Sequence, residues 1–116
     1  MYKILESYFC HKDERGSIKG LINSGSWQEV NYITSKKGCI RGGHYHKKTT
    51  ELFYILKGSI KAVFENESQK QECKFSSGDI FLIEPGTFHT FEMLEDSEWI
   101  NMLSIRMDNN SPDIYK

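Results

Sequence analysis

Short runs in which apolar and polar residues alternate recur along the whole chain, whereas apolar residues at helical spacing are scarce. Clusters rich in Gly, Ser and Asn, such as those at residues 23–26 and 76–78, separate the runs. The runs predict strands at residues 17–22, 27–35, 39–46, 51–56, 59–65, 71–75, 79–83, 87–93 and 99–107. Many short strands at regular turn spacing are typical of an all-β sandwich or barrel.

Length and composition indicate one globular domain over residues 1–116. The sequence is 38% hydrophobic, and it has no internal repeat or linker. The formal net charge of −1 gives no reason to expect nucleic acid or a membrane surface as partner. Three cysteines without a CxxC pair, and an N-terminus without an apolar stretch, predict free thiols in a cytoplasmic protein. The polar tail at residues 108–116 is expected to be mobile or to pack on a neighbour.

Three histidines and one glutamate are the candidate metal ligands. His44 and His46 share one face of a strand and Tyr45 takes the other, because side chains alternate along a strand. Glu51 opens the next strand and can return its carboxylate to the two imidazoles, and His89 lies on a later strand. Together they would suit a divalent metal ion: Zn, Fe, Mn, Ni or Co. A single histidine in a strand is more often a surface or hydrogen-bonded residue than a metal ligand, so the combination carries the prediction.

The spacing of these residues resembles that of the cupin superfamily. Gly38, His44, His46, Glu51 and Gly58 follow the first cupin motif without a gap, and residues 78–89, GDIFLIEPGTFH, resemble the second. The departures are Glu84 for the usual proline and Met93 for the usual asparagine. The resemblance implies a jelly-roll β-barrel, also called a double-stranded β-helix, in which His44, His46, Glu51 and His89 bind a metal.

The flanking residues resemble three kinds of deoxysugar-nucleotide cupin. DERG, SKKG and RGGHYH are similar to dTDP-4-dehydrorhamnose 3,5-epimerases, and RGGHYHK and KGS to dTDP-4-keto-6-deoxyhexose 3,4-ketoisomerases. RGGHYH with a following glutamate also resembles the cupin domain of capsular fucose-synthesis reductases. The resemblance implies isomerisation or epimerisation of a nucleotide-linked 4-keto-6-deoxysugar, by proton transfer next to the ketone, in polysaccharide biosynthesis.

The resemblance also implies roles for individual residues. His44 or His46 would be the catalytic base, and this role competes with metal binding because both use the same ring nitrogen. Tyr32 is a candidate acid or an ordinary packing residue. Arg41 would bind sugar or diphosphate, and Lys47 matches the ketoisomerase motif. Phe53 and Phe91, on the same faces as Glu51 and His89, are expected to line the substrate cavity.

Two other functions fit the same residues, namely a metal-dependent cupin dioxygenase and a non-catalytic sugar-binding cupin. A homodimer is expected, paired through the N-terminal segment at residues 2–9, because an exposed sheet edge is commonly covered in this way.

Overall fold

The computed structural model describes residues 1–116 and consists of strands without a helix. The strands are β1 (Tyr2–Leu5), β2 (Phe9–Asp13), β3 (Gly16–Gly20), β4 (Glu29–Ser35), β5 (Ile40–His44), β6 (Glu51–Lys57), β7 (Ser59–Glu65), β8 (Lys70–Ser76), β9 (Ile80–Ile83), β10 (Phe88–Met93) and β11 (Ser97–Leu103). The structure has no helix of the length and apolar character that crossing a membrane requires.

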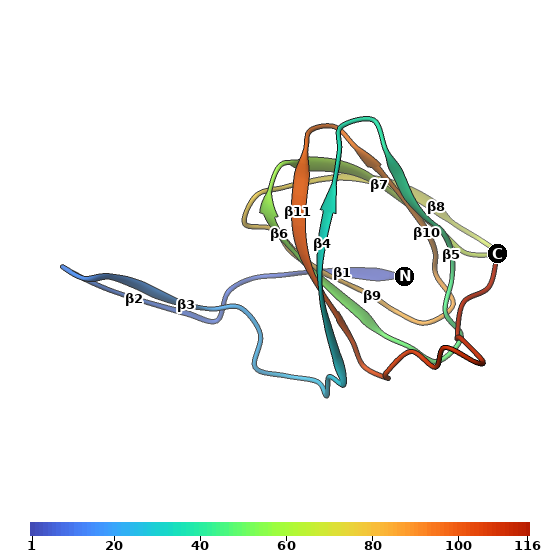
Figure 1. Cartoon of the computed structure of the whole chain (residues 1–116), viewed down its shortest axis with the longest axis horizontal. Coiled ribbons are helices and arrows are strands. Elements are labelled where there is room, and N and C mark those ends of the chain that lie inside the picture. The colour runs from blue at the N-terminus through green and yellow to red at the C-terminus, as the bar shows by residue number, and fades with distance from the viewer.

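Two antiparallel sheets enclose the core. One has the order β1-β9-β6-β11-β4 and the other the order β5-β10-β7-β8. The sheets curve around a common interior in Figure 1, and neighbours in space are often distant in sequence, as β6 is from β11. This crossed order is that of a jelly roll, so the predicted all-β cupin barrel is confirmed.

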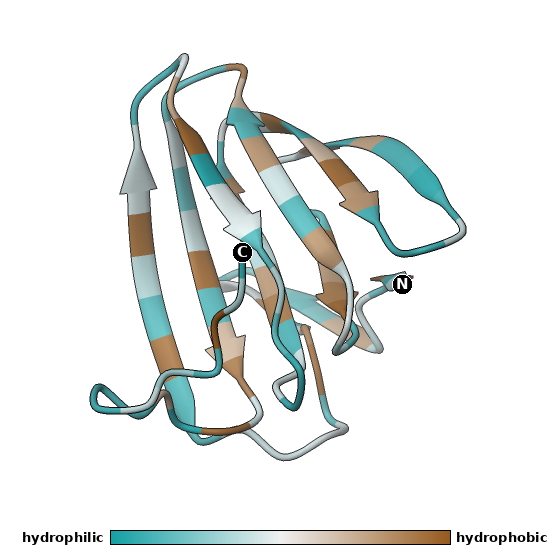
Figure 2. Ribbon diagram, turned by 90° about the vertical axis from the view of Figure 1, so that its right-hand side faces the viewer, coloured by the Kyte–Doolittle hydropathy of each residue, from teal (hydrophilic) through white to brown (hydrophobic).

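Aromatic side chains fill one half of the barrel. Phe81 is fully buried and stacks on Phe75 with ring centroids 4.0 Å apart, while Phe53 lies 5.2 Å from Phe81. Hydrophobic and hydrophilic bands alternate along the strands in Figure 2, as expected for strands with one buried face. Phe53 and Phe91 belong to this core and also line the cavity that contains the histidines.

The N-terminal region differs from the prediction. Residues 2–5 form β1, which pairs with β9 of the same chain, with Tyr2 opposite Ile83 and Leu5 opposite Ile80. The chain then leaves the barrel, and β2 and β3 form a hairpin that projects as an arm (Figure 1). The strand expected at residues 17–22 is therefore one half of this arm and not part of the barrel.

The C-terminal region also differs from the prediction. The last strand ends at Leu103 and not at residue 107, because the chain turns where the Ser104 amide donates to the Thr50 carbonyl. The tail beyond it folds back onto the barrel, where Tyr115 forms a bridge with Tyr45. Main-chain and side-chain hydrogen bonds hold the end of the tail against the barrel of its own chain.

Candidate metal and substrate site

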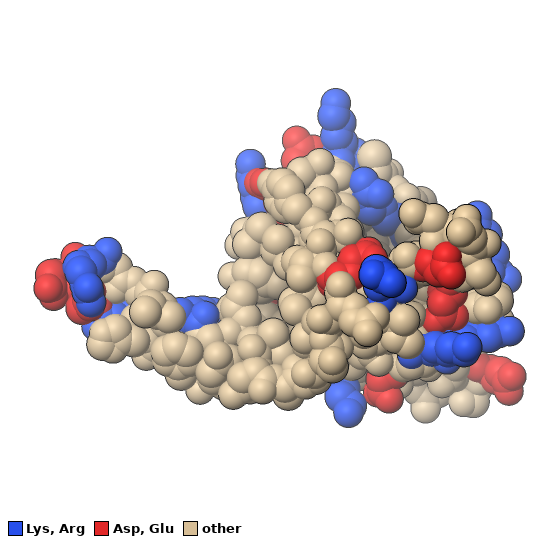
Figure 3. Space-filling model, turned by 60° about the horizontal axis from the view of Figure 1, so that its bottom comes forward, with Lys and Arg blue, Asp and Glu red and all other residues tan.

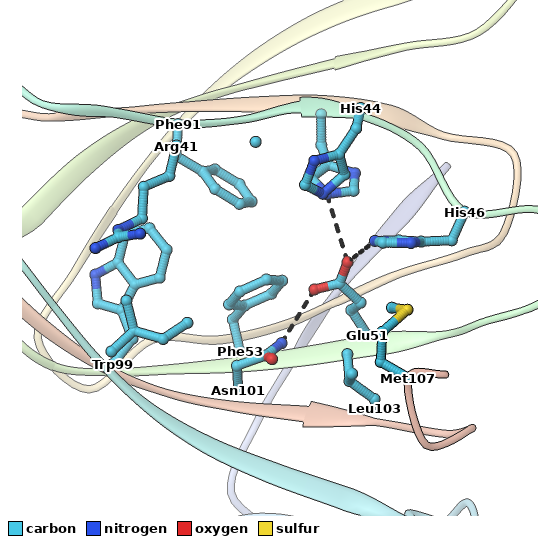
Figure 4. Close-up of a pocket in the computed structure, with 13 residues that line it drawn as sticks. Arg41, His44, His46, Glu51, Phe53, Phe91, Trp99, Asn101, Leu103 and Met107 are labelled. Carbon is cyan, nitrogen blue, oxygen red and sulfur yellow. Dashed lines mark hydrogen bonds and ion pairs between the residues drawn. The ribbon is translucent and has the colours of Figure 1, made fainter. Parts of the chain in front are cut away.

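The four predicted metal ligands converge inside the barrel. His44 ends β5, Glu51 begins β6 and His89 lies in β10, while His46 follows β5. One potential ligand atom from each of the four lies within 4.8 Å of those of the others. Figure 4 shows the imidazoles pointing toward the Glu51 carboxylate from the opposite sheet. Since β5 and β6 belong to different sheets, barrel closure brings these side chains together.

Glu51 is the centre of the cluster. Its Oε1 contacts Nε2 of His46 and lies 3.5 Å from Nε2 of His89. Its Oε2 accepts a hydrogen bond of 3.0 Å from the side-chain amide of Asn101. The carboxylate is only 6% exposed, so these contacts replace its hydration.

Ionisation in the cluster follows from these contacts. Burial raises the pKa of Glu51, but the hydrogen bonds to His46 and His89 outweigh it and lower the pKa to about 2. Burial lowers the pKa of His46, yet the bond to Glu51 raises the net value above 6.5. Burial, with the neighbouring histidines, lowers the pKa of His44 to about 4. Glu51 and His46 thus form an ion pair beside a neutral His44.

Main-chain carbonyls set the orientation of two imidazoles. Nδ1 of His89 lies 3.0 Å from the carbonyl oxygen of Thr87, and Nδ1 of His46 is hydrogen-bonded to the carbonyl oxygen of Asp113. A proton on each Nδ1 leaves Nε2 directed at Glu51 and the cavity, which is the arrangement seen around ligating histidines. The residues present therefore fit a divalent metal ion: the cluster could hold one through His44, His46, Glu51 and His89.

Two consecutive glycines let β5 approach β10. Gly42 has φ of +87° and Gly43 of +73°, and the pairing with β10 shifts by one residue between His89 and Thr90. A Cβ atom at Gly42 would lie 2.5 Å from the carbonyl oxygen of His89. Glycine is required there because any side chain would push apart the strands that carry His44 and His89.

A cavity of about 220 Å³ extends from the histidines along the barrel. Phe53, Phe91 and Trp99 form apolar walls, and Arg41 lies beside Trp99 at the end opposite the histidines (Figure 4). Arg41 donates to the Thr34 carbonyl over 2.9 Å. The buried indole nitrogen of Trp99 has no hydrogen-bond partner. A ligand in this cavity would contact apolar walls, a guanidinium at one end and imidazoles at the other.

Two residues with predicted roles do not line this cavity. Tyr32 is 59% exposed on the outer face of β4, where its hydroxyl donates to Glu98, while the next residue, Ile33, faces inward. Lys47 places its ammonium 4.2 Å from the ring centre of Tyr115. The structure brings Arg41, Phe53 and Phe91 to the cavity as predicted, but it does not bring Tyr32 or Lys47 there.

Several lining residues were missed by sequence reasoning. Trp99, Asn101 and Leu103 share the inner face of β11, and Asn101 is the polar position in that alternating series. A buried asparagine within an apolar strand face is a detectable signal for a polar partner, here Glu51. Asp113 carried no such signal, because it lies in a polar tail far from the motif in sequence.

The chain is similar to known proteins of sugar metabolism. Residues 11–115 match the family described as polysaccharide biosynthesis C-terminal domain. A UDP-2-acetamido-2,6-beta-L-arabino-hexul-4-ose reductase of Pseudomonas aeruginosa is 27% identical over 90% of this chain. The match covers 30% of that protein, so the chain spans about a third of the length of this curated relative.

Solved structures share the fold. A 3,4-ketoisomerase from Helicobacter canadensis superposes with a TM-score of 0.82 at 20% identity, covering 97% of this chain and 88% of that one. The capsular polysaccharide assembling protein CapF from Staphylococcus aureus gives 0.71 at 25% identity, covering 97% and 34%. Because the family match spans nearly the whole sequence, the chain belongs to the polysaccharide biosynthesis C-terminal domain family and has its cupin-type barrel.

Proposed function

We propose that this protein isomerises or epimerises a nucleotide-linked 4-keto-6-deoxysugar by moving a proton next to the ketone. The observation that carries the proposal is a narrow cavity with three imidazoles and a carboxylate at one end and a guanidinium at the other. Imidazoles suit proton transfer near neutral pH, and a guanidinium suits a phosphate or a sugar oxygen.

The names of similar proteins support the substrate class. The Pseudomonas aeruginosa relative is named for a UDP-linked 2,6-substituted hexul-4-ose, and a ketoisomerase structure with this fold contains TDP-4-keto-6-deoxyglucose. Both names describe a 4-ketone on a nucleotide-linked sugar. A ketone acidifies the hydrogen on the adjacent carbon, so a shared ketone favours shared proton chemistry in the barrel.

His44 is the residue that we assign as base. It has no hydrogen bond within the protein, whereas His46 and His89 are held through Nδ1 and both face Glu51. His44 would take the proton from the carbon next to the ketone and leave an enediolate. Delivery of a proton to the ketone carbon, with transfer of the neighbouring hydroxyl proton to the former ketone oxygen, moves the ketone. Delivery of a proton to the opposite face of the first carbon, from a second donor such as water, inverts that carbon. Both outcomes are redox-neutral and need no co-substrate.

The walls of the cavity would exclude water from the enediolate. Phe53, Phe91 and Trp99 are each no more than 3% exposed, so charges within the cavity interact strongly. Arg41, already fixed by β4, would hold sugar or phosphate oxygens.

We propose that the cluster also binds a divalent metal ion through His46, Glu51 and His89. His44 would be a fourth ligand only while it is not acting as base, because one nitrogen cannot hold the ion and accept a proton at the same time. When bound, the ion would polarise the ketone and stabilise negative charge on oxygen. The buried Glu51 and the Nδ1 contacts of His46 and His89 support this part of the proposal, because they orient ligand atoms before any ion arrives.

The test is deuterium exchange followed by NMR. The protein is incubated in deuterated buffer with TDP-4-keto-6-deoxyglucose, and in parallel with a UDP-linked 2-acetamido-4-keto-6-deoxysugar, with and without added Zn²⁺ or Mn²⁺. We expect deuterium at C3 or C5 and a shifted ketone or an inverted centre. His44→Asn should remove exchange, while His11→Asn, on the exposed arm, should not.

The outcomes separate the candidate functions. Absence of exchange with every nucleotide sugar and metal would refute the isomerase proposal. Tight binding of the sugar nucleotide without exchange would support the non-catalytic alternative. Substrate-dependent oxygen uptake by iron-loaded protein would support the oxygenase alternative.

We also propose that two copies of the chain form a homodimer through the arm. Tyr8, Phe9 and Ile18 are each at least 44% exposed, and an isolated two-stranded hairpin is marginal in water. The space-filling view shows charges of both signs gathered at the tip of the arm, with further Lys or Arg atoms nearer the barrel (Figure 3). Edge strand β4 offers a partner surface, because its Val30 is 63% exposed.

Light scattering tests the proposed dimer. The wild-type protein should give twice the chain mass, and Ile18→Asp should give a monomer. A wild-type monomer would reject the proposal.

A further inference from the structure

The C-terminal segment lies against the candidate site. After β11 the chain passes Met107, which lines the cavity beside Glu51 in Figure 4, and continues to Asp113 and Tyr115. Tyr45 and Tyr115 exchange main-chain hydrogen bonds of 2.8 and 2.9 Å, which ties the tail to the residue between the two motif histidines. The end of the chain is thus part of the wall around His46.

The Asp113 carboxylate organises the loop between His46 and Glu51. Its oxygens accept hydrogen bonds of 3.0, 2.9 and 3.0 Å from the amides of Lys47, Lys48 and Thr49. It also accepts a bond of 2.9 Å from the hydroxyl of Thr49, which is 2% exposed. These donors hold the pKa of Asp113 near 2 despite partial desolvation, so the carboxylate stays charged at neutral pH.

The main chain of the same residue contacts His46 directly. The Asp113 carbonyl oxygen accepts from Nδ1 of His46, and Nε2 of that imidazole faces Glu51. A ring held at Nδ1 has one tautomer available in its neutral form, with the lone pair on Nε2. Asp113 therefore contacts the His46 imidazole through its carbonyl oxygen and the following loop through its carboxylate.

Only residues 47–50 separate His46 from Glu51 in the sequence. A loop this short cannot move without moving one of the two side chains that it joins. Three consecutive amides fixed on one carboxylate set the path of this loop, and the carbonyl on the same residue sets the ring orientation. Lys47, which packs over the Tyr115 ring, holds the tail from the other side.

We propose that Asp113 is a positioning residue for the site: it anchors the C-terminal segment so that its carbonyl fixes His46 with Nε2 toward the cavity. The consequence for catalysis rests on the proposed function, whereas the consequence for imidazole orientation does not. Groups that orient a ligating histidine typically change metal affinity or activity by about 10- to 100-fold when removed.

The experiment compares Asp113→Ala, Asp113→Asn and Asp108→Ala in the full chain. Asp108 lies on the same tail and bonds only its neighbour Asn110, so it is a matched control for loss of charge. Zn²⁺ affinity is measured by competition with a chromophoric chelator. The ring nitrogens are followed by ¹⁵N NMR at high pH, where the chain's four histidines give a simple spectrum.

We expect Asp113→Ala to weaken Zn²⁺ binding by about 10- to 100-fold. We also expect the neutral His46 ring to change from a single Nδ1-protonated form to a mixture. Asp113→Asn retains an acceptor and should fall between wild type and Asp113→Ala, and Asp108→Ala should match wild type. If exchange activity is present, Asp113→Ala should lower kcat more than it raises KM, because the group acts through His46.

Unchanged Zn²⁺ affinity and an unchanged His46 tautomer in folded Asp113→Ala would overturn the inference. Equal effects of Asp108→Ala would do the same, since they would point to general electrostatics. If Asp113→Ala fails to fold, Asp113→Asn and Thr49→Val, which removes one hydroxyl donor, carry the same comparison. A wild-type protein without exchange activity refutes the proposed function, but the tautomer measurement still decides the role of Asp113.

Discussion

Replacing Glu51 with glutamine tests the electrostatics of the buried cluster. Glutamine has nearly the shape of a protonated carboxyl group and lacks the charge that pairs with His46. The variant Glu51→Gln therefore leaves the packing of the barrel in place and removes the ion pair. The measurement uses chelator-treated protein, so that only the residues of the chain contribute.

The magnitude follows from the pKa of Glu51, which is lowered from 4.5 to about 2. The difference of about 2.5 pKa units, at about 1.4 kcal/mol each, gives about 3 kcal/mol in favour of the ionised carboxylate in the folded state. Because the pKa is depressed, this contribution is present above pH 4.5 and is lost as pH falls toward 2. We therefore expect Glu51→Gln to lower the free energy of unfolding by about 3 kcal/mol at pH 5.5.

The cost should depend on pH, because His46 titrates in the same range. The raised pKa of His46 stabilises the wild-type fold fully below pH 6.5, and this contribution is lost as pH rises through the folded-state value. In Glu51→Gln a protonated His46 would be buried without its partner. The loss of stability should thus be greater at pH 5.5 than at pH 8.5.

Urea unfolding at the two pH values measures this difference. Glu92→Gln is the control, since Glu92 lies 3.4 Å from Lys61 with both side chains 45% exposed. Solvent screens that surface pair, so its loss should change the free energy of unfolding little at either pH. An equal cost of Glu51→Gln at both pH values, or a greater cost at pH 8.5, would refute the proposed ion pair.

Three further predictions follow from the fold and the site. Gly42→Ala should lower the free energy of unfolding by roughly 1–3 kcal/mol and weaken Zn²⁺ binding. Gly43→Ala should leave Zn²⁺ binding intact, because a Cβ atom there meets nothing within 4 Å. Equal Zn²⁺ affinities for the two variants would contradict the close approach of β5 to β10. Zn²⁺ binding should release protons at pH 6, because the pKa of His46 is raised and the imidazole must lose its proton to bind. Calorimetry that gives one enthalpy in buffers of different ionisation enthalpy would argue against this. Phe81→Ala should lower the free energy of unfolding, measured in urea, by about 3–5 kcal/mol. Leu56→Ala should lower it by less than about 1 kcal/mol, because Leu56 is 41% exposed.

The barrel strands were predictable because their signal is local. Alternation of apolar and polar residues marks a strand with one buried face, and the strand predicted at 59–65 matches β7. The arm was not recognised, because an exposed hairpin has the same alternation without a barrel behind it. The strand expected to end at 107 stops at Leu103, where the Ser104 amide bonds to Thr50, a residue distant in sequence.

The cluster of candidate ligands was also determined by sequence. Strand alternation predicts that His44 and His46 share a face, and the motif spacing adds Glu51. Glu51 reaches the two imidazoles only because closure of the barrel brings β6 of one sheet to β5 of the other. His89 was a candidate from its place on a later strand, and the resemblance of residues 78–89 to a known motif supported it. These residues converge in the structure within 4.8 Å.

Tertiary structure alone decided which neighbours surround the cluster. Alternation says that Tyr32 and Ile33 face opposite ways, but only pairing with β11 decides that Ile33 faces the cavity. Likewise, the contact of Asp113 with His46 joins positions 67 residues apart. The periodicity of a strand is set by adjacent residues, whereas the choice of inner face and the path of a tail depend on closure of the barrel between distant segments.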